Sequence, residues 1–387
     1  MTLKLCVPNI VEKPLPLPAK GEPIRVPVEN QYDFTDLAEL KITWEIGEER
    51  GEAKAFVPPH STGALLVKPQ RMPERGDILS LTFTHPNGLL VDTYRLPFDQ
   101  ESSPAPAHKS AEATPLILRQ EERLVGIATH VIGKEFELAF DSGSGMLRRG
   151  VAFGLPMLLE FPALHVLPTA APLAPLPDRL SWQLQAIEAK QEGENVRLTV
   201  KGTYANFQGT YDLLITPSGE MTVKADFEFT GEELWAREVG LRFSVPKSSD
   251  LLQWERRADW NVYPPDHIGR PLGSVRAYAD HGSELPPAWP WGQDNAPMGS
   301  NDFRSTKRNV LWTALRHQGG TGVLVLSDGR HHARATMETD RISLHINGWF
   351  GGTNAGWWEW EHNYGKGRLL KKGDHIQETI RLRFARF

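Results

Sequence analysis

The sequence predicts an all-β protein, a small sandwich followed by a much larger antiparallel domain. Three observations predict this class. Apolar and polar residues alternate in short segments along most of the 387 residues, which is the period of a half-buried strand. The 30 prolines and 34 glycines divide the chain into segments bounded by turns. No run shows a convincing helical period of 3.6 residues.

The first predicted domain covers residues 1–98. It contains alternating segments with strand character at 24–34, 38–48, 77–86 and 90–98. Strands of this length and spacing, without a helix between them, are typical of a sandwich of immunoglobulin-like size. Trp44 lies in the middle of one segment and is expected to anchor the core. Residues 99–115 lack apolar periodicity and are rich in Ser, Ala and Pro, so they are expected to form a linker.

The second predicted domain covers residues 116–387. Long alternating segments resume there, and the sequence TPSGE at 216–220 predicts a hairpin turn between two of them. So much near-continuous antiparallel β structure is best accommodated in one large double-sheet domain. The proline-rich stretch 162–180 is expected to be irregular and to cross the surface of a sheet.

Composition excludes several classes of protein. The net charge of −5 does not suit a protein that binds nucleic acid, and no apolar run is long enough to span a membrane. Cys6 is the single cysteine, so neither an internal disulfide nor a multi-cysteine zinc site is possible. The N-terminus does not resemble a signal peptide, so a cytoplasmic location is expected. We expect no cofactor and no metal ion.

Tryptophan is unevenly distributed, since nine of the twelve follow residue 250. Flat aromatic faces are suited to hold the apolar face of a sugar ring, although burial in a core is the simpler explanation for any single one. Three irregular segments, 254–273, 286–309 and 348–365, combine tryptophans with charged residues. Long irregular segments in a compact domain are often functional. His331 and His332 are adjacent in a predicted strand, so they should face opposite sides and not share a metal ion.

The chain resembles the C-terminal part of family 2 glycoside hydrolases of the β-galactosidase type. The segments that carry the resemblance are 30–46, which looks like their immunoglobulin-like domain, and 135–154, 254–273, 299–315 and 348–358, which look like their last domain. Within 254–273 the matching positions are Tyr263, Pro264, Asp266 and Arg270. The sequence departs from the family at 161–177, where a proline-rich stretch replaces several expected polar residues.

The resemblance implies an immunoglobulin-like sandwich followed by a supersandwich related to galactose mutarotases. It also implies that a glycine-rich loop delivers one tryptophan to the sugar site, here Trp357 or Trp358. The family's catalytic glutamates lie on a barrel of eight alternating strands and helices, and that pattern is absent from this sequence.

Three functions remain open at this point. The chain is predicted to be an accessory subunit or fragment of a β-galactosidase-like hydrolase, completed by a separate chain that carries the barrel. Alternatively, it is a stand-alone carbohydrate-binding protein or a mutarotase-like enzyme. The candidate catalytic residues are Asp266, His267, Glu338, Glu359 and His362, and the candidate sugar-binding residues are Trp357, Trp358, Trp289, Trp291, Arg270 and Arg304. Asp266 and Arg270 are alternatively predicted to pair and hold their loop.

Overall fold

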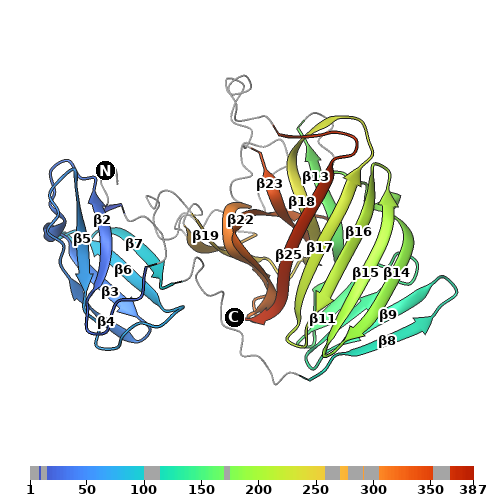
Figure 1. Ribbon diagram of the computed structural model, residues 1–387, viewed down its shortest axis with the longest axis horizontal. Coiled ribbons are helices and arrows are strands. Elements are labelled where there is room, and N and C mark those ends of the chain that lie inside the picture. The colour runs from blue at the N-terminus through green and yellow to red at the C-terminus, as the bar shows by residue number, and fades with distance from the viewer. Residues whose placement is uncertain are drawn as a thin grey trace. The chain divides into compact units, whose positions relative to one another are not determined.

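The computed structural model describes residues 15–99, 114–169, 175–257, 271–277, 291, 305–351 and 367–387, and the backbone of Pro8–Asn9. These residues divide into two compact units, one of residues 15–99 and one that contains nearly all described residues from 114 onward. Within them the structure consists of β-strands and two short 3-10 helices, so the all-β prediction is confirmed (Figure 1). No helix among the described residues is long and apolar enough to cross a membrane.

The first unit is a sandwich of two antiparallel sheets. One sheet contains β1 (Pro8–Asn9), β2 (Ile24–Asn30) and β5 (Ser61–Val67), and the other contains β4 (Glu49–Ala53), β3 (Lys41–Ile46), β6 (Ile78–Thr84) and β7 (Leu90–Pro97). The 3-10 helix η1 (Leu37–Glu39) precedes β3 and is capped by the Asp36 side chain. Trp44 is buried in the apolar core between the sheets, which confirms its predicted role as an anchor.

The second unit is a continuous antiparallel array of long strands with one apolar core. Its first strands are β8 (Ile117–Glu122), β9 (Ile127–Ile132), β10 (Phe136–Phe140), β11 (Leu147–Ala152), β12 (Leu155–Leu158), β13 (Glu160–Pro168), β14 (Gln183–Glu192), β15 (Asn195–Tyr204) and β16 (Phe207–Ile215). They are followed by β17 (Glu220–Phe229), β18 (Leu234–Pro246), β19 (Leu251–Arg256), β20 (Leu272–Arg276), β21 (Thr306–Arg316), β22 (Thr321–Met337), β23 (Arg341–Phe350), β24 (Arg368–Leu370) and β25 (His375–Arg386). The 3-10 helix η2 (Arg179–Ser181) precedes β14.

Two layers of strands enclose the core of this unit. β14, β15, β16, β17 and β25 pair in that order and run side by side in Figure 1. β13, β18, β23 and the second half of β22 form the other layer. Tyr211 of β16 reaches across the core and accepts a hydrogen bond from the Leu164 backbone N–H of β13, at 2.6 Å. The two layers therefore pack with their apolar faces together.

β22 belongs to both layers. Its residues 321–326 pair with β25, whereas residues 332–337 pair with β23. Such a long strand can change partner because the sheets twist and diverge along its length. β22 thereby links the two layers covalently as well as by hydrogen bonds.

The predicted hairpin at 216–220 is confirmed. It joins β16 to β17, and Gly219 adopts a φ of 78°, a left-handed conformation that favours glycine.

By contrast, the prediction that residues 162–180 form an irregular stretch is wrong for its first part. Residues up to Pro168 belong to β13, which pairs with β18 over nearly its whole length. Proline has no backbone N–H group to donate to a neighbouring strand. Pro162 falls at a register irregularity and Pro168 ends the strand, so no hydrogen bond between β13 and β18 is lost at either position.

Candidate functional site

One face of the layer formed by β13, β18, β23 and β22 is polar although it is buried. Alternate residues of a strand face opposite sides, so Glu238, Arg242 and Ser244 of β18 point away from the apolar core. Their cross-strand neighbours on the same side are also polar. We call this set the polar face: His165 on β13, Glu238, Arg242 and Ser244 on β18, Ser343, His345 and Asn347 on β23, and Arg334 and Thr336 on β22. All of these except Thr336 are buried.

Glu238 is the centre of the polar face. The Arg334 guanidinium contacts both of its oxygens, with Nη2 donating to Oε2 at 2.9 Å and Nε lying 2.7 Å from Oε1. Nε2 of His165 lies 2.8 Å from Oε2, and Nδ2 of Asn347 donates to the same oxygen at 3.2 Å. Burial alone would raise the pKa of Glu238, but Arg334 and His165 outweigh it and hold this pKa at about 2. The carboxylate is therefore ionised and can only accept hydrogen bonds.

Both histidines of the polar face are neutral at physiological pH. Burial lowers the pKa of His165 despite its contact with Glu238, and burial together with nearby cations holds the pKa of His345 well below its usual value. Because Glu238 only accepts, Nε2 of His165 carries the proton and Nδ1 presents a lone pair. That Nδ1 atom, Nδ1 of His345 and Oδ1 of Asn347 have no hydrogen-bond partner among the described residues.

Metal binding is a chemical possibility for three of these residues. His165, Glu238 and His345 each offer one ligand atom, and these atoms lie within 4.8 Å of one another. The Arg334 guanidinium, however, already contacts both oxygens of Glu238, and its charge repels a metal cation. The trio therefore fits hydrogen bonding to a ligand better than it fits a metal ion.

A glycine makes room for this arrangement. Gly240 lies between Glu238 and Arg242 on β18, and a Cβ added there would meet Oδ1 of Asn347 at 2.9 Å and the Ile346 carbonyl oxygen at 2.2 Å. Any side chain at this position would displace Asn347 from the polar face.

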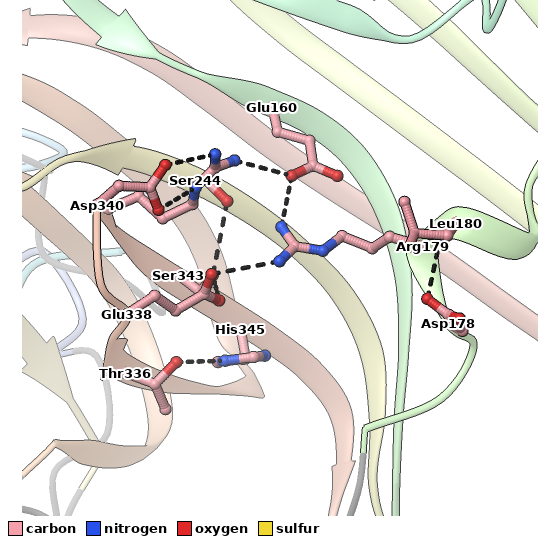
Figure 2. A network of polar contacts seen from close by, with 11 residues as sticks. Glu160, Asp178, Arg179, Leu180, Ser244, Thr336, Glu338, Asp340, Ser343 and His345 are labelled. Carbon is pink, nitrogen blue, oxygen red and sulfur yellow. Dashed lines mark hydrogen bonds and ion pairs between the residues drawn. The ribbon is translucent and has the colours of Figure 1, made fainter.

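A network of ion pairs continues from the polar face at the start of β13 and β23 (Figure 2). Oε2 of Glu160 accepts from Nη1 of Arg179 at 2.7 Å and from Nη1 of Arg341 at 3.2 Å. Nη2 of Arg179 also donates to Glu338 at 3.3 Å, and the Ser343 hydroxyl donates to the other oxygen of Glu338. We call Glu160, Arg179, Glu338, Asp340 and Arg341 the rim network.

A cavity of about 760 Å³ lies beside the rim network, and Glu160, Arg179 and Arg341 line it. Trp182 and Tyr204 form an aromatic part of its wall, with ring centroids 4.7 Å apart. The indole N–H of Trp182 donates to the Ser144 carbonyl at 2.8 Å, which fixes the ring. Pockets for small molecules commonly have volumes of about 300–1,000 Å³, so this cavity is large enough for a small ligand.

Of the residues predicted from the sequence, Glu338 and Trp291 lie in the described part of the chain. Glu338 belongs to the rim network, where it is bonded to Arg179 and Ser343. Trp291 is 1% exposed and its indole N–H donates to the Asp250 carbonyl, so it presents no face to a sugar in this structure. The remaining candidates lie outside the described residues: Asp266, His267, Glu359, His362, Trp357, Trp358, Trp289, Arg270 and Arg304.

The predicted separation of His331 and His332 agrees with their neighbours. Nδ1 of His331 lies 2.8 Å from the Ser327 hydroxyl, whereas Nδ1 of His332 accepts from the Asn309 backbone N–H at 3.2 Å. Burial lowers the pKa of each to about 4.

The polar face itself was not predicted from the sequence. Its signal was present in β18, where Glu238, Arg242 and Ser244 lie on one side of the strand and the positions between them, Val239, Leu241 and Phe243, are apolar.

No protein-family model matches the chain, and no curated protein matches its sequence significantly. Membership of the β-galactosidase-type family is therefore a hypothesis that rests on the resemblance in sequence.

Several solved structures are similar to 70–72% of this chain. One from Escherichia coli K12, provisionally assigned as an aldose 1-epimerase, matches over 100% of its own length with 11% identity and a TM-score of 0.36. A galactose 1-epimerase from Lactobacillus acidophilus matches over 98% of its length with 12% identity and a TM-score of 0.33. A glycoside hydrolase family 97 enzyme from Pseudoalteromonas matches over 35% of its length, with 8% identity and a TM-score of 0.33. These scores are too low to carry an argument about ligand or residues.

Proposed function

We propose that the second unit binds a saccharide in the cavity beside the rim network. The observation that carries this proposal is the composition of the cavity wall, where one fixed indole adjoins carboxylate and guanidinium groups. Sugars combine apolar C–H faces with hydroxyl groups that both donate and accept hydrogen bonds. A wall with an aromatic face, donors and acceptors complements both properties.

The aromatic part of the wall is rigid. Trp182 packs over Gly202, where an added Cβ would lie 2.5 Å from the indole ring, so a larger residue would push the ring away. Its other neighbours are the rings of Tyr204 and Tyr211. Because the indole is held on these sides, little side-chain entropy would be lost when a ligand stacks on it.

The polar part of the wall is also held in place. Each carboxylate of the rim network is bonded to an arginine, and Arg341 in addition contacts both oxygens of Asp340. Carboxylates paired in this way still offer lone pairs to sugar hydroxyl groups.

Binding is favoured over acid–base catalysis for the residues of the polar face and the rim network. A general base needs a carboxylate or imidazole that is free to take a proton near neutral pH. Glu160, Glu238 and Glu338 are all paired with arginines, and His165 already donates to Glu238. The stand-alone carbohydrate-binding protein is therefore the function that this geometry supports best.

The β-galactosidase-like accessory role is a finer hypothesis, and the resemblance in sequence supports it. It predicts hydrolysis of a chromogenic β-galactoside only when a separate barrel-containing chain is added. A cytoplasmic location likewise stays a prediction from the sequence.

Binding can be tested by titrating the purified chain with a panel of mono- and disaccharides. Tryptophan fluorescence and isothermal titration calorimetry measure the affinity for each sugar. Trp182→Ala should weaken saccharide binding by about tenfold or more, because aromatic stacking platforms contribute about 1–3 kcal/mol. Trp235→Ala is the matched control, since Trp235 is 43% exposed and does not line the cavity. Equal affinities for both variants and the unmodified chain would place the sugar elsewhere.

A further inference from the structure

The wall of the cavity beside the rim network contains apolar side chains as well as charged ones. Apart from the aromatic residues, the apolar residues that line it are Met146, Leu147, Leu159, Pro162, Ala163 and Leu180. Leu180 differs from the others in its exposure, because it is 93% exposed whereas Met146 and Leu147 are at most 9% exposed. Leu180 therefore has almost its whole side chain available to a ligand.

Leu180 lies in η2 directly after Arg179, and the geometry of this turn separates the two side chains. Consecutive residues of a 3-10 helix are rotated by about 120° around its axis, since the helix has three residues per turn. Arg179 extends from the turn toward Glu160 and Glu338 of the rim network (Figure 2). Leu180 accordingly projects in a different direction, and it does not pack against the apolar core. The turn thus places a charged group and an apolar group next to each other on the cavity wall.

The backbone that carries Leu180 is held by hydrogen bonds. The Asp178 side chain accepts from the Leu180 N–H at 3.0 Å. The Ser181 hydroxyl donates to the Asp178 carbonyl at 2.6 Å and accepts from the Ala205 N–H at 3.2 Å, which ties η2 to the end of β15. A leucine held in solvent in this way gains little from the fold, but a ligand can cover it without first ordering its backbone.

An unsubstituted sugar would complement only part of this wall. Its hydroxyl groups can pair with the rim network, and its apolar ring face can stack on Trp182. A hydroxyl group placed against Leu180 would instead lose water without gaining a hydrogen bond. The cavity volume of about 760 Å³ lies in the upper part of the range of about 300–1,000 Å³ that is usual for small-molecule pockets, so there is room for a substituent beside a sugar ring.

We propose that the saccharide is a glycoside with an apolar aglycone, and that this aglycone covers Leu180. The inference rests on the proposed function and names the class of its ligand. Contact between an alkyl or aryl aglycone and the leucine would remove apolar surface of both from water. This burial would strengthen binding by about tenfold or more relative to the same sugar without an apolar group.

The experiment compares the methyl and n-hexyl β-glycosides of glucose and of galactose by isothermal titration calorimetry on the full chain, below the concentrations at which the hexyl glycosides form micelles. Within each pair the sugar is the same and only the aglycone differs. We expect the hexyl glycoside to bind at least about tenfold more tightly than the methyl glycoside of the same sugar. n-Hexanol carries the apolar chain without the sugar and should bind much more weakly than the hexyl glycosides.

Two variants test the role of Leu180. Leu180→Ser should reduce the ratio of hexyl to methyl affinity to below about threefold, because it removes the apolar surface. Leu124→Ser is the matched control and should keep the ratio of the unmodified chain, since Leu124 is fully exposed but does not line the cavity. Both variants should keep the melting temperature of the unmodified chain. A loss of several degrees in Leu180→Ser would show that its side chain is packed against the protein, which would overturn the inference.

The outcomes separate the two proposals. Equal affinity for the methyl and hexyl glycosides, or a ratio that Leu180→Ser leaves unchanged, overturns the aglycone inference and leaves saccharide binding standing. Binding of a sugar from the mono- and disaccharide panel, but of none of the four glycosides, has the same consequence. No binding of any sugar or glycoside overturns both. If n-hexanol bound as tightly as the hexyl glycosides, the cavity would be a site for an apolar chain and the sugar assignment would be wrong.

Discussion

The two faces of the layer formed by β13, β18, β23 and β22 are equally buried but chemically opposite. On the face toward the core, Leu241, Phe243 and Leu344 are at most 1% exposed. On the polar face, Glu238, Ser244 and Asn347 are fully buried as well. Burial of the first face stabilises the folded protein because it removes apolar surface from water. Burial of the second face removes water from polar groups, so each group needs a hydrogen bond or an ion pair to compensate for its lost hydration.

The comparison shows that burial alone does not identify a core. The apolar face needs only volume, so its residues can be exchanged for others of similar size. The polar face needs specific partners, and several of its atoms have none among the described residues. Buried polar atoms without partners destabilise the folded protein. A surface that contains them is therefore a better candidate for a functional role than for a purely structural one.

The largest effect is expected where the polar face loses its central charge. Glu238→Gln leaves Arg334 buried without a carboxylate, and breaking a buried pair typically costs about 3–5 kcal/mol. Urea unfolding measures this free energy, with the exposed Glu122→Gln as the control. A loss below about 1 kcal/mol would show that the pair is not desolvated as the structure indicates.

The apolar face should respond to a loss of volume instead. Leu344→Ala removes a fully buried side chain and is expected to destabilise the second unit by about 2–5 kcal/mol. Saccharide affinity measured below the unfolding transition should stay unchanged, since Leu344 does not line the cavity. If affinity fell as sharply as stability, the two faces would not be functionally distinct.

Glu378 extends the comparison because it is a buried carboxyl that forms no ion pair with a lysine or arginine among the described residues. Burial raises its pKa to about 7, and the imidazole 3.8 Å away, that of His331, is neutral at this pH. Between pH 4.5 and 7 the unfolded chain loses the proton of Glu378 while the folded chain keeps it. The contribution of Glu378 to stability is therefore complete below pH 4.5 and is lost as pH rises to 7, by at most about 3 kcal/mol.

Glu378→Gln should abolish that part of the pH dependence. Relative to the unmodified chain, the variant is expected to gain stability as pH rises from 4.5 to 8, in urea unfolding at several pH values. Glu238 has the opposite sign, because its pKa of about 2 means that stability is lost as pH falls below the ordinary value. A constant difference between variant and unmodified chain across this range would contradict the raised pKa of Glu378.

The smallest effect concerns a polar group within the apolar core. Tyr211→Phe removes the hydroxyl that accepts from Leu164 N–H and contacts the Tyr204 hydroxyl at 2.9 Å. Because the Leu164 N–H would be left buried without an acceptor, the free energy of unfolding should fall by about 1–3 kcal/mol, as measured by thermal or urea unfolding. The matched variant Tyr204→Phe leaves the Leu164 bond intact and should cost less. Equal losses for the two would mean that the hydroxyl pair, not the backbone bond, matters most.

The fold was predictable from the sequence to a large extent, because strands and turns leave local signals. Alternation predicted the strand that carries Trp44, and the residues TPSGE predicted the turn at Gly219. The strand β13 was missed because proline was given too much weight, although its prolines fall where no ladder bond is needed.

The site was much less predictable. The polar face assembles His165, Glu238, Arg334 and Asn347 from four strands, of which only β22 and β23 are consecutive in the sequence. Which residues meet depends on strand order and register, and neither can be derived from local patterns. Glu338 was identified as a candidate from the sequence, but its pairing with Arg179 depends on the strand register and was not predictable.

The long strand β22 has a consequence for how the second unit opens. Because residues 321–326 are bonded to β25 and residues 332–337 to β23, neither layer can separate without disrupting a strand that the other also uses. Partial unfolding of one layer is thereby coupled to the other, so the amide hydrogens of β22 should exchange with solvent only when the whole unit unfolds. A ligand in the cavity beside the rim network would then slow exchange throughout both layers rather than in its own surroundings alone.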